Sequence, residues 1–537
     1  MGLLRAAASI LCGSLCIAAA EPPQPPAAIL DAAMAGVSSR QPGCAVGVMD
    51  GGRLTHVRGF GAADIETGRP ITPQTPFNLA SMSKSFTAAA IALLVRDGRI
   101  GPEDDIRRYL PELPDYGTPV RIRHLLHHTS GLRNHMALAA FQPGAPLPSH
   151  EEALGLVFRQ RALNFTPGSR HQYESPNYVL LAEIVSRVSG MTFEEFLIRR
   201  IFRPLGMAHT GFAEPDLARA YAPNSAGGFT LTERVNGARG SSNLVSTLED
   251  FATWLGALDR GALGADLLST MMAGTRLDDG TPVSYSYGLA VERDHRGIAG
   301  LTMIGHGGQT AAWRSRFTYF PGRGFGTVML CNVANAPLGA VDEAAAFWVN
   351  ANSTPVATAP IANQPLPAAE AARWAGFYLD AEGDAVQEIG LENGALTYVS
   401  FGTGSPLAYA GDGRFTLGSA FGFRFADGAM TETGPNQPAI RYARLTPPGA
   451  LRLIDYVGRY RSGEVDGEIV IRAENDALVV TAPFGEIRPA PVHPDGFAVP
   501  ASDIAHLSFL RDGGEQVTGL TITTTSGIAR LRFDRVG

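Results

Sequence analysis

The last third of the chain repeats itself, and this repeat limits the possible folds more than any other feature of the sequence. The segment WAGFY at 374–378 aligns with YVGRY at 456–460, 82 positions later. The same offset aligns E-N-x-A-L at 392–396 with 474–478, and Phe415 with Phe497. Self-similarity at one fixed offset indicates duplicated structural units. We therefore predict two β modules, at residues 371–446 and 452–537.

Each module alternates short β-rich runs with turn residues, which is typical of a small antiparallel barrel. We expect each barrel to close, because closure leaves no unpaired edge strand. An Ala- and Pro-rich linker at 351–370 precedes the modules.

Residues 28–350 have a different pattern. Strand-like runs such as CAVGVM at 44–49 and GTVMLC at 326–331 flank helix-like runs such as NYVLLAEIVSRVSG at 177–190, which ends at a glycine. Helices inserted between the terminal strands of an antiparallel sheet predict an α/β (α+β) domain.

The first twenty residues have the pattern of a secretory signal peptide. Arg5 precedes an apolar run at 6–17, and three alanines at 18–20 precede Glu21. The alternative is a retained anchor, but the run is shorter than the roughly 20 residues that a spanning helix needs. We expect cleavage after residue 20, a secreted or periplasmic protein, and no stable membrane insertion.

Two cysteines remain after that cleavage, Cys44 and Cys331, each in a strand-like run. They can pair in an oxidising compartment if their strands are neighbours in one sheet. We favour the alternative of two buried thiols, because cysteine is among the most buried residue types.

The charged residues give no support to nucleic-acid binding. The chain has 44 Lys and Arg against 51 Asp and Glu, a net charge of −7, and it lacks a Lys/Arg-rich run. Of the 44 basic residues, 43 are arginine and one is lysine, Lys84.

Lys84 stands in the segment SMSK at 81–84, at the start of a predicted helix. Positions i and i+3 share a helix face, so its amine lies one turn from the Ser81 hydroxyl. A serine is a weak nucleophile until a base takes its proton, and a desolvated lysine can be that base whereas arginine cannot. We therefore predict a Ser81–Lys84 pair; the alternative is a surface lysine in a chance motif.

Three further segments carry candidate polar groups. YES at 173–175 places a phenol in the loop before a helix, and HGG at 306–308 places a histidine on a strand beside glycines that permit close approach. The alternatives are a half-buried tyrosine and a strand-end turn. RIRHLLHHTSGL at 121–132 lacks H-E-x-x-H spacing and a Cys or acidic partner, so we expect no metal at its histidines, His124, His127 and His128.

Taken in chain order, SMSK at 81–84, YES at 173–175 and HGG at 306–308 resemble the S-x-x-K, Y-x-N and K-T-G or H-x-G motifs of serine hydrolases of the β-lactamase and penicillin-binding-protein superfamily. The segments HLLHHTSGL, RPLGMAHTGF and VSTLEDFATWL resemble its class C-related branch, which includes esterases, DD-peptidases and D-aminopeptidases. The resemblance covers residues 28–350 and implies the fold of that superfamily.

The resemblance also implies a mechanism that needs neither a metal nor an organic cofactor. Ser81 is acylated, Lys84 shares its proton, and Tyr173 acts as general base and then as acid toward the leaving group. The backbone N–H groups of Ser81 and Gln309 form the oxyanion hole. The implied substrate-binding positions are Ser175, His306, Gly307, Gly308 and Gln309.

Two positions depart from the superfamily pattern. Ser175 replaces an asparagine amide by a shorter hydroxyl, which favours esters or unusual peptides over β-lactams. His306 replaces the lysine of K-T-G and is largely neutral at pH 7, so it is a poorer anchor for a substrate carboxylate. Arg314 and Arg316 are candidates to supply that charge.

An α/β domain of this kind followed by two barrels resembles the three-domain D-aminopeptidases. In that family a loop of the last barrel reaches the active site and meets the free amine of the substrate. The corresponding turn here is APFGEIRP at 482–489, with Glu486 as candidate counter-ion. The alternative is a solvated turn carboxylate.

The leading hypothesis is a secreted serine hydrolase that acts on D-amino-acid peptides or amides. The alternatives are a carboxylesterase on short acyl esters, a β-lactamase or DD-peptidase, and a penicillin-binding-type sensor that acylates without turnover. The expected partner is a small peptide, amide or ester substrate, and the sequence does not indicate an oligomeric state.

Overall fold

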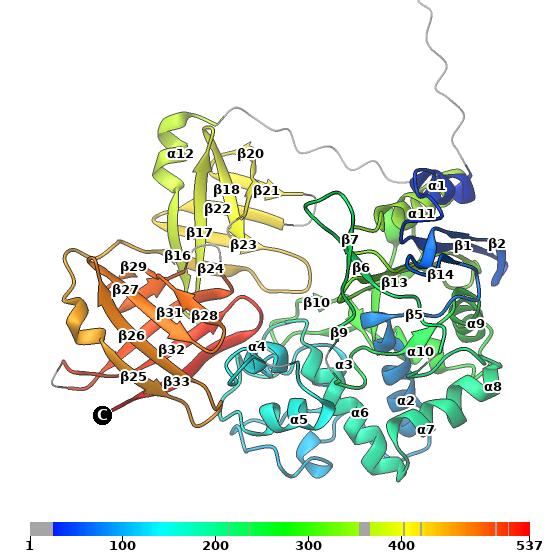
Figure 1. The fold of residues 1–537 in the computed structure, drawn as a ribbon, viewed down its shortest axis with the longest axis horizontal. Coiled ribbons are helices and arrows are strands. Elements are labelled where there is room, and N and C mark those ends of the chain that lie inside the picture. The colour runs from blue at the N-terminus through cyan, green and yellow to red at the C-terminus, as the bar shows by residue number, and fades with distance from the viewer. Residues whose placement is uncertain are drawn as a thin grey trace, which may run out of the picture.

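The computed structural model describes residues 25–145, 147–213, 215–235, 237–353, 366–400, 403–418, 421–499, 502–513 and 515–537. The predicted signal peptide, 1–20, and positions 354–365 of the predicted linker lie outside the described residues. Figure 1 shows an α/β domain from the N-terminal part of the chain and two β bodies from the C-terminal part.

A seven-stranded antiparallel sheet forms the centre of the α/β domain, in the order β11-β12-β13-β14-β15-β1-β2. The first two strands of the chain, β1 and β2, therefore continue the sheet beyond β15, which is the last strand of the domain in the sequence. The strands are β1 Cys44–Asp50, β2 Arg53–Phe60, β11 Tyr285–Ser286, β12 Leu289–Glu292, β13 Met303–Thr310, β14 Trp313–Phe320 and β15 Phe325–Cys331.

Helices cover both faces of this sheet, and β1 shows how its sequence serves both. Cys44, Val46 and Val48 pack with α1 (Pro26–Ala33) and α11 (Gly339–Asn352). The alternate residues Ala45 and Met49 belong to the larger core on the other face. Successive side chains of a strand point to opposite faces, so an unbroken apolar run suits a strand that is buried on both sides. The larger core holds α2 (Lys84–Arg96), α6 (Ser175–Ser189) and α9 (Leu248–Asp259).

Shorter elements complete the α/β domain. The helices are α3 Ile122–Leu126, α4 His135–Ala139, α5 His150–Phe158, α7 Phe193–Leu197, α8 Arg203–Leu205 and α10 Leu267–Met271. The two-stranded pairs are β3 Ala62–Asp64 with β4 Arg69–Pro70, β5 Phe77–Asn78 with β8 Val245–Ser246, β6 Tyr221–Pro223 with β7 Phe229–Leu231, and β9 Thr275–Arg276 with β10 Pro282–Val283. In the described parts of the chain, no helix is long and apolar enough to span a membrane.

The cysteine hypothesis that we favoured, two buried thiols, is wrong. The structure pairs Cys44 with Cys331 as a disulfide, with an S–S distance of 2.11 Å. The reason is strand order, because β1 and β15 are neighbours and their register places these two residues opposite each other. Burial and pairing are compatible here, since both residues are completely buried.

The C-terminal part forms two nine-stranded antiparallel sheets with the same strand order. We call them the first and second barrel. The first has β16 Gly376–Asp380, β17 Ala385–Glu392, β18 Ala395–Ser400, β19 Thr403–Pro406, β20 Ala408–Gly411, β21 Arg414–Leu417, β22 Phe421–Ala426, β23 Ala429–Thr433 and β24 Ile440–Arg444, preceded by α12 Ala368–Trp374. The second has β25 Gly458–Arg461, β26 Glu468–Glu474, β27 Ala477–Ala482, β28 Gly485–Ile487, β29 Ala490–His493, β30 Gly496–Ala498, β31 Ile504–Arg511, β32 Val517–Thr524 and β33 Ile528–Val536.

The expectation of two similar antiparallel β units is confirmed. In the first, edge strands β19 and β20 are separated only by Leu407, so the sheet must curl until its two edges meet at that residue. The sheets are therefore curled and barrel-like. The repeat extends to single bonds: the Tyr378 hydroxyl donates to the Trp374 carbonyl and the Tyr460 hydroxyl to the Tyr456 carbonyl, both at 2.7 Å.

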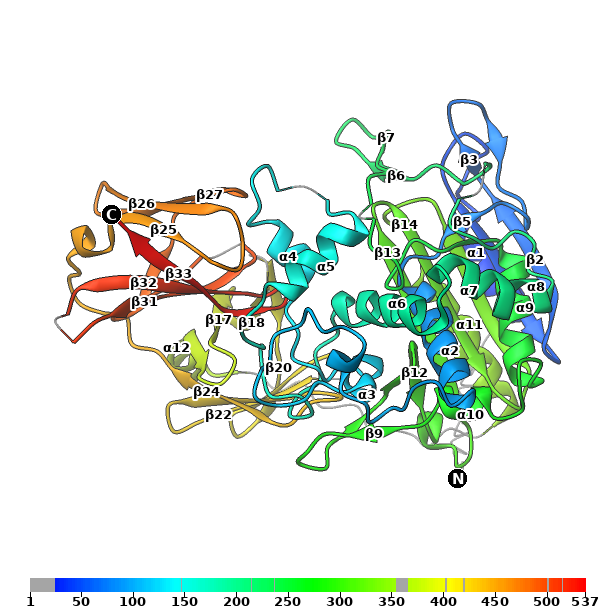
Figure 2. The same cartoon turned by 90° about the horizontal axis from the view of Figure 1, so that it is seen from below.

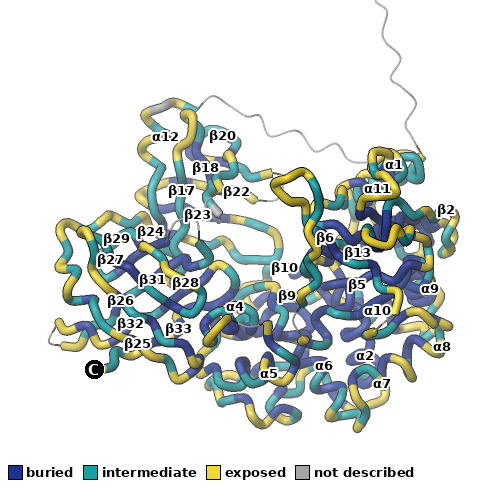
Figure 3. The backbone as a smooth tube through the Cα atoms, in the orientation of Figure 1, coloured by how far each residue is buried: buried dark blue, intermediate teal, exposed yellow. Residues whose placement is uncertain are grey.

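The second barrel shares an apolar core with the α/β domain. Phe141, completely buried after α4, packs its ring against those of Phe484 and Phe533. Figures 1 and 2 both place α4 beside this barrel, and Figure 3 shows the buried residues of the α/β domain gathered around α2 and α10. This contact brings the second barrel to the side of the domain from which α6 begins.

Candidate active site

Ser81 and Lys84 lie at the start of α2, as the sequence predicts. A 3₁₀ turn at Ala80–Ser83 leads into the helix, and the Lys84 Nζ lies 3.0 Å from the Ser81 Oγ. The same nitrogen donates a 2.8 Å hydrogen bond to the Ser241 carbonyl. Ser81 is half-buried, whereas Lys84 is completely buried. The serine is therefore open to a ligand while its lysine partner is not.

Burial changes the protonation of this lysine. Desolvation lowers the pKa of Lys84 to about 7, although the nearby Glu174 carboxylate opposes the shift. Burial removes the amine from water and so disfavours the charged ammonium. A substantial fraction of the lysine is therefore neutral near pH 7. An arginine at this position would stay protonated.

Tyr173 precedes α6 and lies against the pair. The Lys84 Nζ is 4.9 Å from the centroid of the Tyr173 ring. Desolvation raises the pKa of the Tyr173 phenol above its ordinary value, and hydrogen bonding to Ser81 and Tyr285 offsets only part of that rise. Because 41% of the residue is exposed, Tyr173 borders the open side of the site. This phenol keeps its proton at neutral pH.

His306 lies on β13 and is held in one tautomer. Its Nδ1 bonds the Gly307 carbonyl, which can only accept, so Nδ1 carries the proton. Its Nε2 then accepts from the Tyr285 hydroxyl at 2.9 Å. Desolvation and the nearby Lys84 lower the pKa of His306 to about 4, so the imidazole is neutral at pH 7. The side chain is a hydrogen-bonding group and not a cation.

The glycines after His306 let β13 pass close to the serine turn. A Cβ on Gly308 would lie 2.2 Å from the Ser315 Oγ and 2.4 Å from the Leu79 carbonyl oxygen, so any side chain there would clash with the residues just before Ser81. There is more room for a side chain at Gly307. Gln309 follows on the same strand and is exposed. The structure therefore brings the HGG segment beside the Ser81 turn.

Ser175 occupies the third position of the Y-x-N-like triplet, and the nearby Asn177 does not replace the missing amide at the site. Ser175 begins α6 and is half-buried. The Asn177 amide is buried and turned inward, where its Nδ2 lies 2.9 Å from the His128 Nδ1 and its Oδ1 accepts from Ser130 at 2.5 Å. The asparagine of this segment thus fixes the loop that carries His128.

Tyr285 and Glu174 are two site residues that sequence reasoning missed. The Tyr285 ring packs on His128 and Tyr173, with centroid distances of 4.6 and 5.6 Å, while its hydroxyl holds His306. The sequence signal for the position of Tyr285 was Gly288, three residues later. A Cβ there would lie 2.5 Å from the Lys84 carbonyl carbon, so only glycine lets the β11–β12 turn cross α2 at this point. Glu174 is the middle residue of the YES segment at 173–175, but no sequence pattern indicated that it is buried.

Glu486 forms ion pairs within its own barrel, and its role as a counter-ion stays a prediction. Its exposed carboxylate lies on β28 and is ion-paired with Arg472 at 3.1 Å and Arg488 at 3.5 Å. Two arginines of its own barrel therefore neutralise it, as expected for a solvated turn carboxylate. The turn of the second barrel that touches the motif segment is the β32–β33 turn, where Gly527 lies directly against Glu174. The docking of the barrel on α4, which no sequence pattern encodes, selects this turn.

The clustered histidines serve the framework of the site. The His127 Nδ1 bonds the Tyr285 carbonyl at 2.9 Å, and the His128 Nδ1 accepts from the Glu174 backbone N–H at 3.1 Å. The His124 Nδ1 accepts from the Arg121 N–H. Within the described residues, no group of three or more His, Cys, Asp or Glu side chains is arranged to hold a metal ion.

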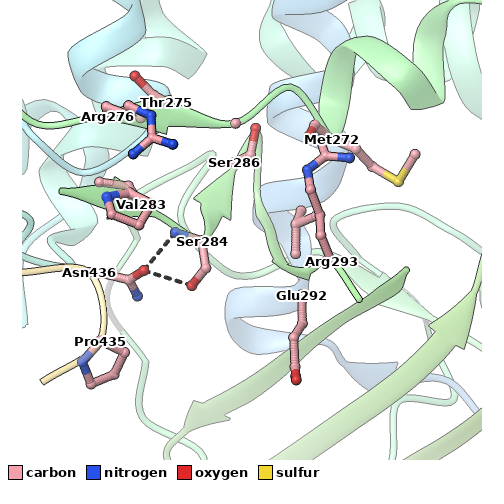
Figure 4. A pocket seen from close by; sticks show the side chains of 13 residues that line it. Met272, Thr275, Arg276, Val283, Ser284, Ser286, Glu292, Arg293, Pro435 and Asn436 are labelled. Carbon is pink, nitrogen blue, oxygen red and sulfur yellow. Dashed lines mark hydrogen bonds between the residues drawn. The ribbon is translucent and has the colours of Figure 1, made fainter. Parts of the chain in front are cut away.

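A groove of about 850 Å³ lies on the other side of the strand that carries Tyr285. Figure 4 shows Ser284 and Ser286 facing this groove, with Asn436 of the first barrel at its edge. The Asn436 Oδ1 accepts from the Ser284 N–H at 2.6 Å and from its hydroxyl at 2.7 Å. The first barrel therefore contacts the back of the strand whose Tyr285 holds His306.

Comparison with known proteins places the chain in a family. The family model described as Beta-lactamase matches residues 27–350, so the chain belongs to the beta-lactamase family. It is 26% identical to the D-aminopeptidase of Brucella canis over 504 residues, which covers 90% of this chain and 93% of that protein. It is also 26% identical over 511 residues to the D-aminopeptidase of Cereibacter sphaeroides.

Two solved structures resemble this chain in fold. The D-amino acid amidase from Ochrobactrum anthropi SV3 complexed with L-phenylalanine amide is 26% identical, with a TM-score of 0.51, and covers 61% of this chain and 99% of its own. The octameric penicillin-binding protein homologue from Pyrococcus abyssi is 22% identical, with a TM-score of 0.54, and covers 77% and 98%. The second likeness concerns the fold alone.

Proposed function

We propose that this member of the beta-lactamase family is a serine hydrolase that forms an acyl-enzyme on Ser81 and cleaves amides or short peptides of D-amino acids. The 3.0 Å contact between the Lys84 amine and the Ser81 hydroxyl, with the pKa of the amine near 7, carries the reaction class. The similarity to D-aminopeptidases and to a D-amino acid amidase supports the substrate class.

The first step uses Lys84 as the base. Its neutral amine takes the proton of the Ser81 hydroxyl while Oγ bonds to the substrate carbonyl carbon, and the carbonyl electrons move to oxygen. The backbone N–H groups of Ser81 and Gln309 are the proposed donors to that oxyanion, and each donor of this kind is worth about 10²–10³ in rate.

Tyr173 completes the proton path as an acid. Its phenol is protonated at neutral pH, as tyrosine ordinarily is, and desolvation raises its pKa further; it can therefore donate to the leaving nitrogen as the C–N bond breaks. The phenolate then recovers a proton from the Lys84 ammonium, which restores the base. Water then attacks the ester carbonyl carbon and loses a proton to Lys84, which returns that proton to the Ser81 Oγ as the ester C–O bond breaks and the acid product leaves.

Two observations disfavour substrates that are anchored by a carboxylate, such as β-lactams and C-terminal D-Ala peptides. His306 is neutral at pH 7. Of the two arginines that are candidates to supply charge, Arg316 is already paired with Asp342 at 2.6 Å. A carboxylesterase is the second candidate, because Ser175 offers a hydroxyl where relatives have an amide and Asn177 points into the interior.

A parallel assay separates these activities. The mature protein is tested on the p-nitroanilides of D-alanine and L-alanine, on p-nitrophenyl acetate and on a chromogenic cephalosporin. We expect the D-anilide to have the highest kcat/KM. Faster turnover of the ester selects the carboxylesterase, and one stoichiometric burst without turnover selects a sensor.

Lys84→Arg tests the base, since it keeps the charge and removes the neutral form. We expect kcat/KM to fall by about 10²–10⁴-fold. In the unaltered enzyme kcat/KM should rise as the pH passes about 7, because Lys84 is protonated and inactive below that pH. Near-normal hydrolysis by Lys84→Arg, or by Ser81→Ala as its companion, contradicts the mechanism.

We also propose that the enzyme acts outside the cytoplasm after removal of residues 1–20. The Cys44–Cys331 disulfide fits an oxidising compartment. N-terminal sequencing of the protein recovered from a bacterial periplasm tests this, and an intact Met1 on exported protein would contradict it.

A further inference from the structure

Glu174 is a buried carboxylate that the proposed mechanism does not use. It follows Tyr173 directly, is only 4% exposed, and its Oε2 has no hydrogen-bond partner among the described residues. Buried polar atoms in folded proteins are nearly always hydrogen-bonded, so such an oxygen calls for an explanation. Its cost is offset by a favourable charge nearby or by protonation of the carboxylate.

The second barrel completes the burial of this carboxylate. A Cβ on Gly527, in the β32–β33 turn, would lie 1.9 Å from the Glu174 Oε1, so the turn backbone rests directly on the carboxylate. The Gly527 carbonyl accepts from the Asn134 N–H at 2.9 Å and from the Asn164 Nδ2 at 3.0 Å. The Asn164 Oδ1 in turn accepts from the Ala529 N–H at 2.8 Å. These bonds hold the turn against the α/β domain and keep water from Glu174.

The charges that act on Glu174 come from both sides of this interface. Lys84, from α2, lowers its pKa, whereas Asp503, from the second barrel, and above all desolvation raise it. Asn134, before α4, adds a neutral hydrogen bond. His128 receives the Glu174 backbone N–H, and its own pKa is well below the ordinary value because of burial.

The groups that face Lys84 are otherwise uncharged. Burial lowers the pKa of His135 and His306 to about 4, and raises that of the Tyr173 and Tyr178 phenols. In the described part of the chain, Glu174 is the carboxylate that acts on Lys84. The charge of each group therefore affects the proton affinity of the other.

We propose that Glu174 is a positioning residue through which the second barrel sets the proton balance of the Ser81–Lys84 pair. An ionised Glu174 stabilises the Lys84 ammonium and so holds back the base, whereas a protonated Glu174 leaves the amine free to accept the serine proton. The Gly527 turn and Asp503 both act against ionisation of Glu174. The proposal rests on the proposed role of Ser81 and Lys84, but not on the identity of the substrate.

The test is the pH dependence of the rate at which a fluorophosphonate labels Ser81 in the full-length mature protein, followed by intact mass. Glu174→Gln keeps the shape and removes the ability to ionise, so Lys84 loses its proton more easily at every pH at which Glu174 would carry its negative charge. We expect the acidic limb of the profile to move down by about one pH unit. A structural role alone would lower the rate equally at every pH.

Asp503→Asn is the matching change on the barrel side. It removes a charge that opposes ionisation of Glu174, so the limb should move up, opposite to Glu174→Gln. In the double variant the limb should stay where Glu174→Gln places it, because Asp503 acts through Glu174. Glu382→Gln, which removes an exposed charge from the first barrel, should leave the limb in place.

The outcomes are separable. If the unaltered protein carries no adduct on Ser81 at any pH, the proposed function itself fails. If Ser81 is labelled but the profiles of Glu174→Gln and the unaltered protein superimpose, Glu174 does not tune the pair. If Asp503→Asn still shifts the limb without Glu174, or Glu382→Gln shifts it as much, the route through the second barrel is wrong.

Discussion

The two barrels share one strand order, yet only the second adds a shared apolar core to its polar contacts with the α/β domain. Among the described residues, the apolar core of the first barrel consists of its own residues and of those just before it, from Leu366 onward. The second barrel shares its core with α4 and α5 of the α/β domain. The first barrel instead contacts that domain through polar groups, such as the ion pair of Arg170 with Asp380 at 2.7 Å.

The two barrels have the same internal structure but make different contacts with the site. Both barrels keep the internal bonds that make the curled sheet, including the matching hydrogen bonds of Tyr378 and Tyr460. Only the second covers a buried carboxylate beside Tyr173, while the first touches the back of the strand that carries Tyr285. An apolar interface holds a barrel in a fixed position, which a contact to a titratable group requires. Three stability predictions test this contrast.

The largest effect is expected at the second barrel. The Arg133 guanidinium is buried and bonds Gln160, Glu464 and the carbonyls of Ala529 and Arg530. Arg133→Met leaves Glu464 buried without its cation, so we expect urea unfolding to show a loss of about 3–5 kcal/mol. Arg159→Met, which breaks an exposed pair with Asp466 in the same interface, should cost about 0–1 kcal/mol. Equal losses for both variants would contradict the contrast within this interface.

A smaller effect is expected at the first barrel. Arg170→Met removes the partner of Asp380, which is buried, and of Glu382, whose side chain is 82% exposed. We expect a loss of about 1–3 kcal/mol by the same urea unfolding, because the side-chain bonds of Arg170 go to these two carboxylates, whereas Arg133→Met also removes the donor to two carbonyls of the second barrel. A loss as large as that of Arg133→Met would mean that the two barrels are held alike.

The smallest effects sharpen the likeness of the two barrels. Tyr378→Phe and Tyr460→Phe each remove a hydroxyl that bonds a carbonyl four residues earlier. Each should lower the free energy of unfolding by about 1 kcal/mol, and by similar amounts. Hydrogen exchange of the two barrels measures both. A difference of more than about 1 kcal/mol would show that docking has changed the internal stability of one repeat.

Several features of the fold and the site follow from local patterns. The offset of 82 residues predicts the duplicated sheets, since each repeat must bury the same apolar face. The i,i+3 spacing predicts the contact of Ser81 with Lys84, because three residues make nearly one helical turn. The residue type predicts that His306 is neutral, and burial extends this by lowering its pKa to about 4.

Other features depend on how distant segments pack. The disulfide depends on β1 and β15 becoming neighbours in register, which neither run of residues encodes alone. The choice of Gly527 over Glu486 depends on where the second barrel docks. The inward turn of Asn177 depends on His128 and Ser130 from another segment.

The sequence by itself determined the duplicated β units, the serine–lysine pair and the order of the motifs, because periodicity and spacing act over a few residues. The tertiary structure alone decided the protonation of that pair. The pKa of Lys84 is near 7 because packing removes water from its amine, and Glu174 opposes this shift from beneath a turn that lies more than 350 residues further along the chain. Solvation is a property of all neighbours in space, so no local pattern contains it.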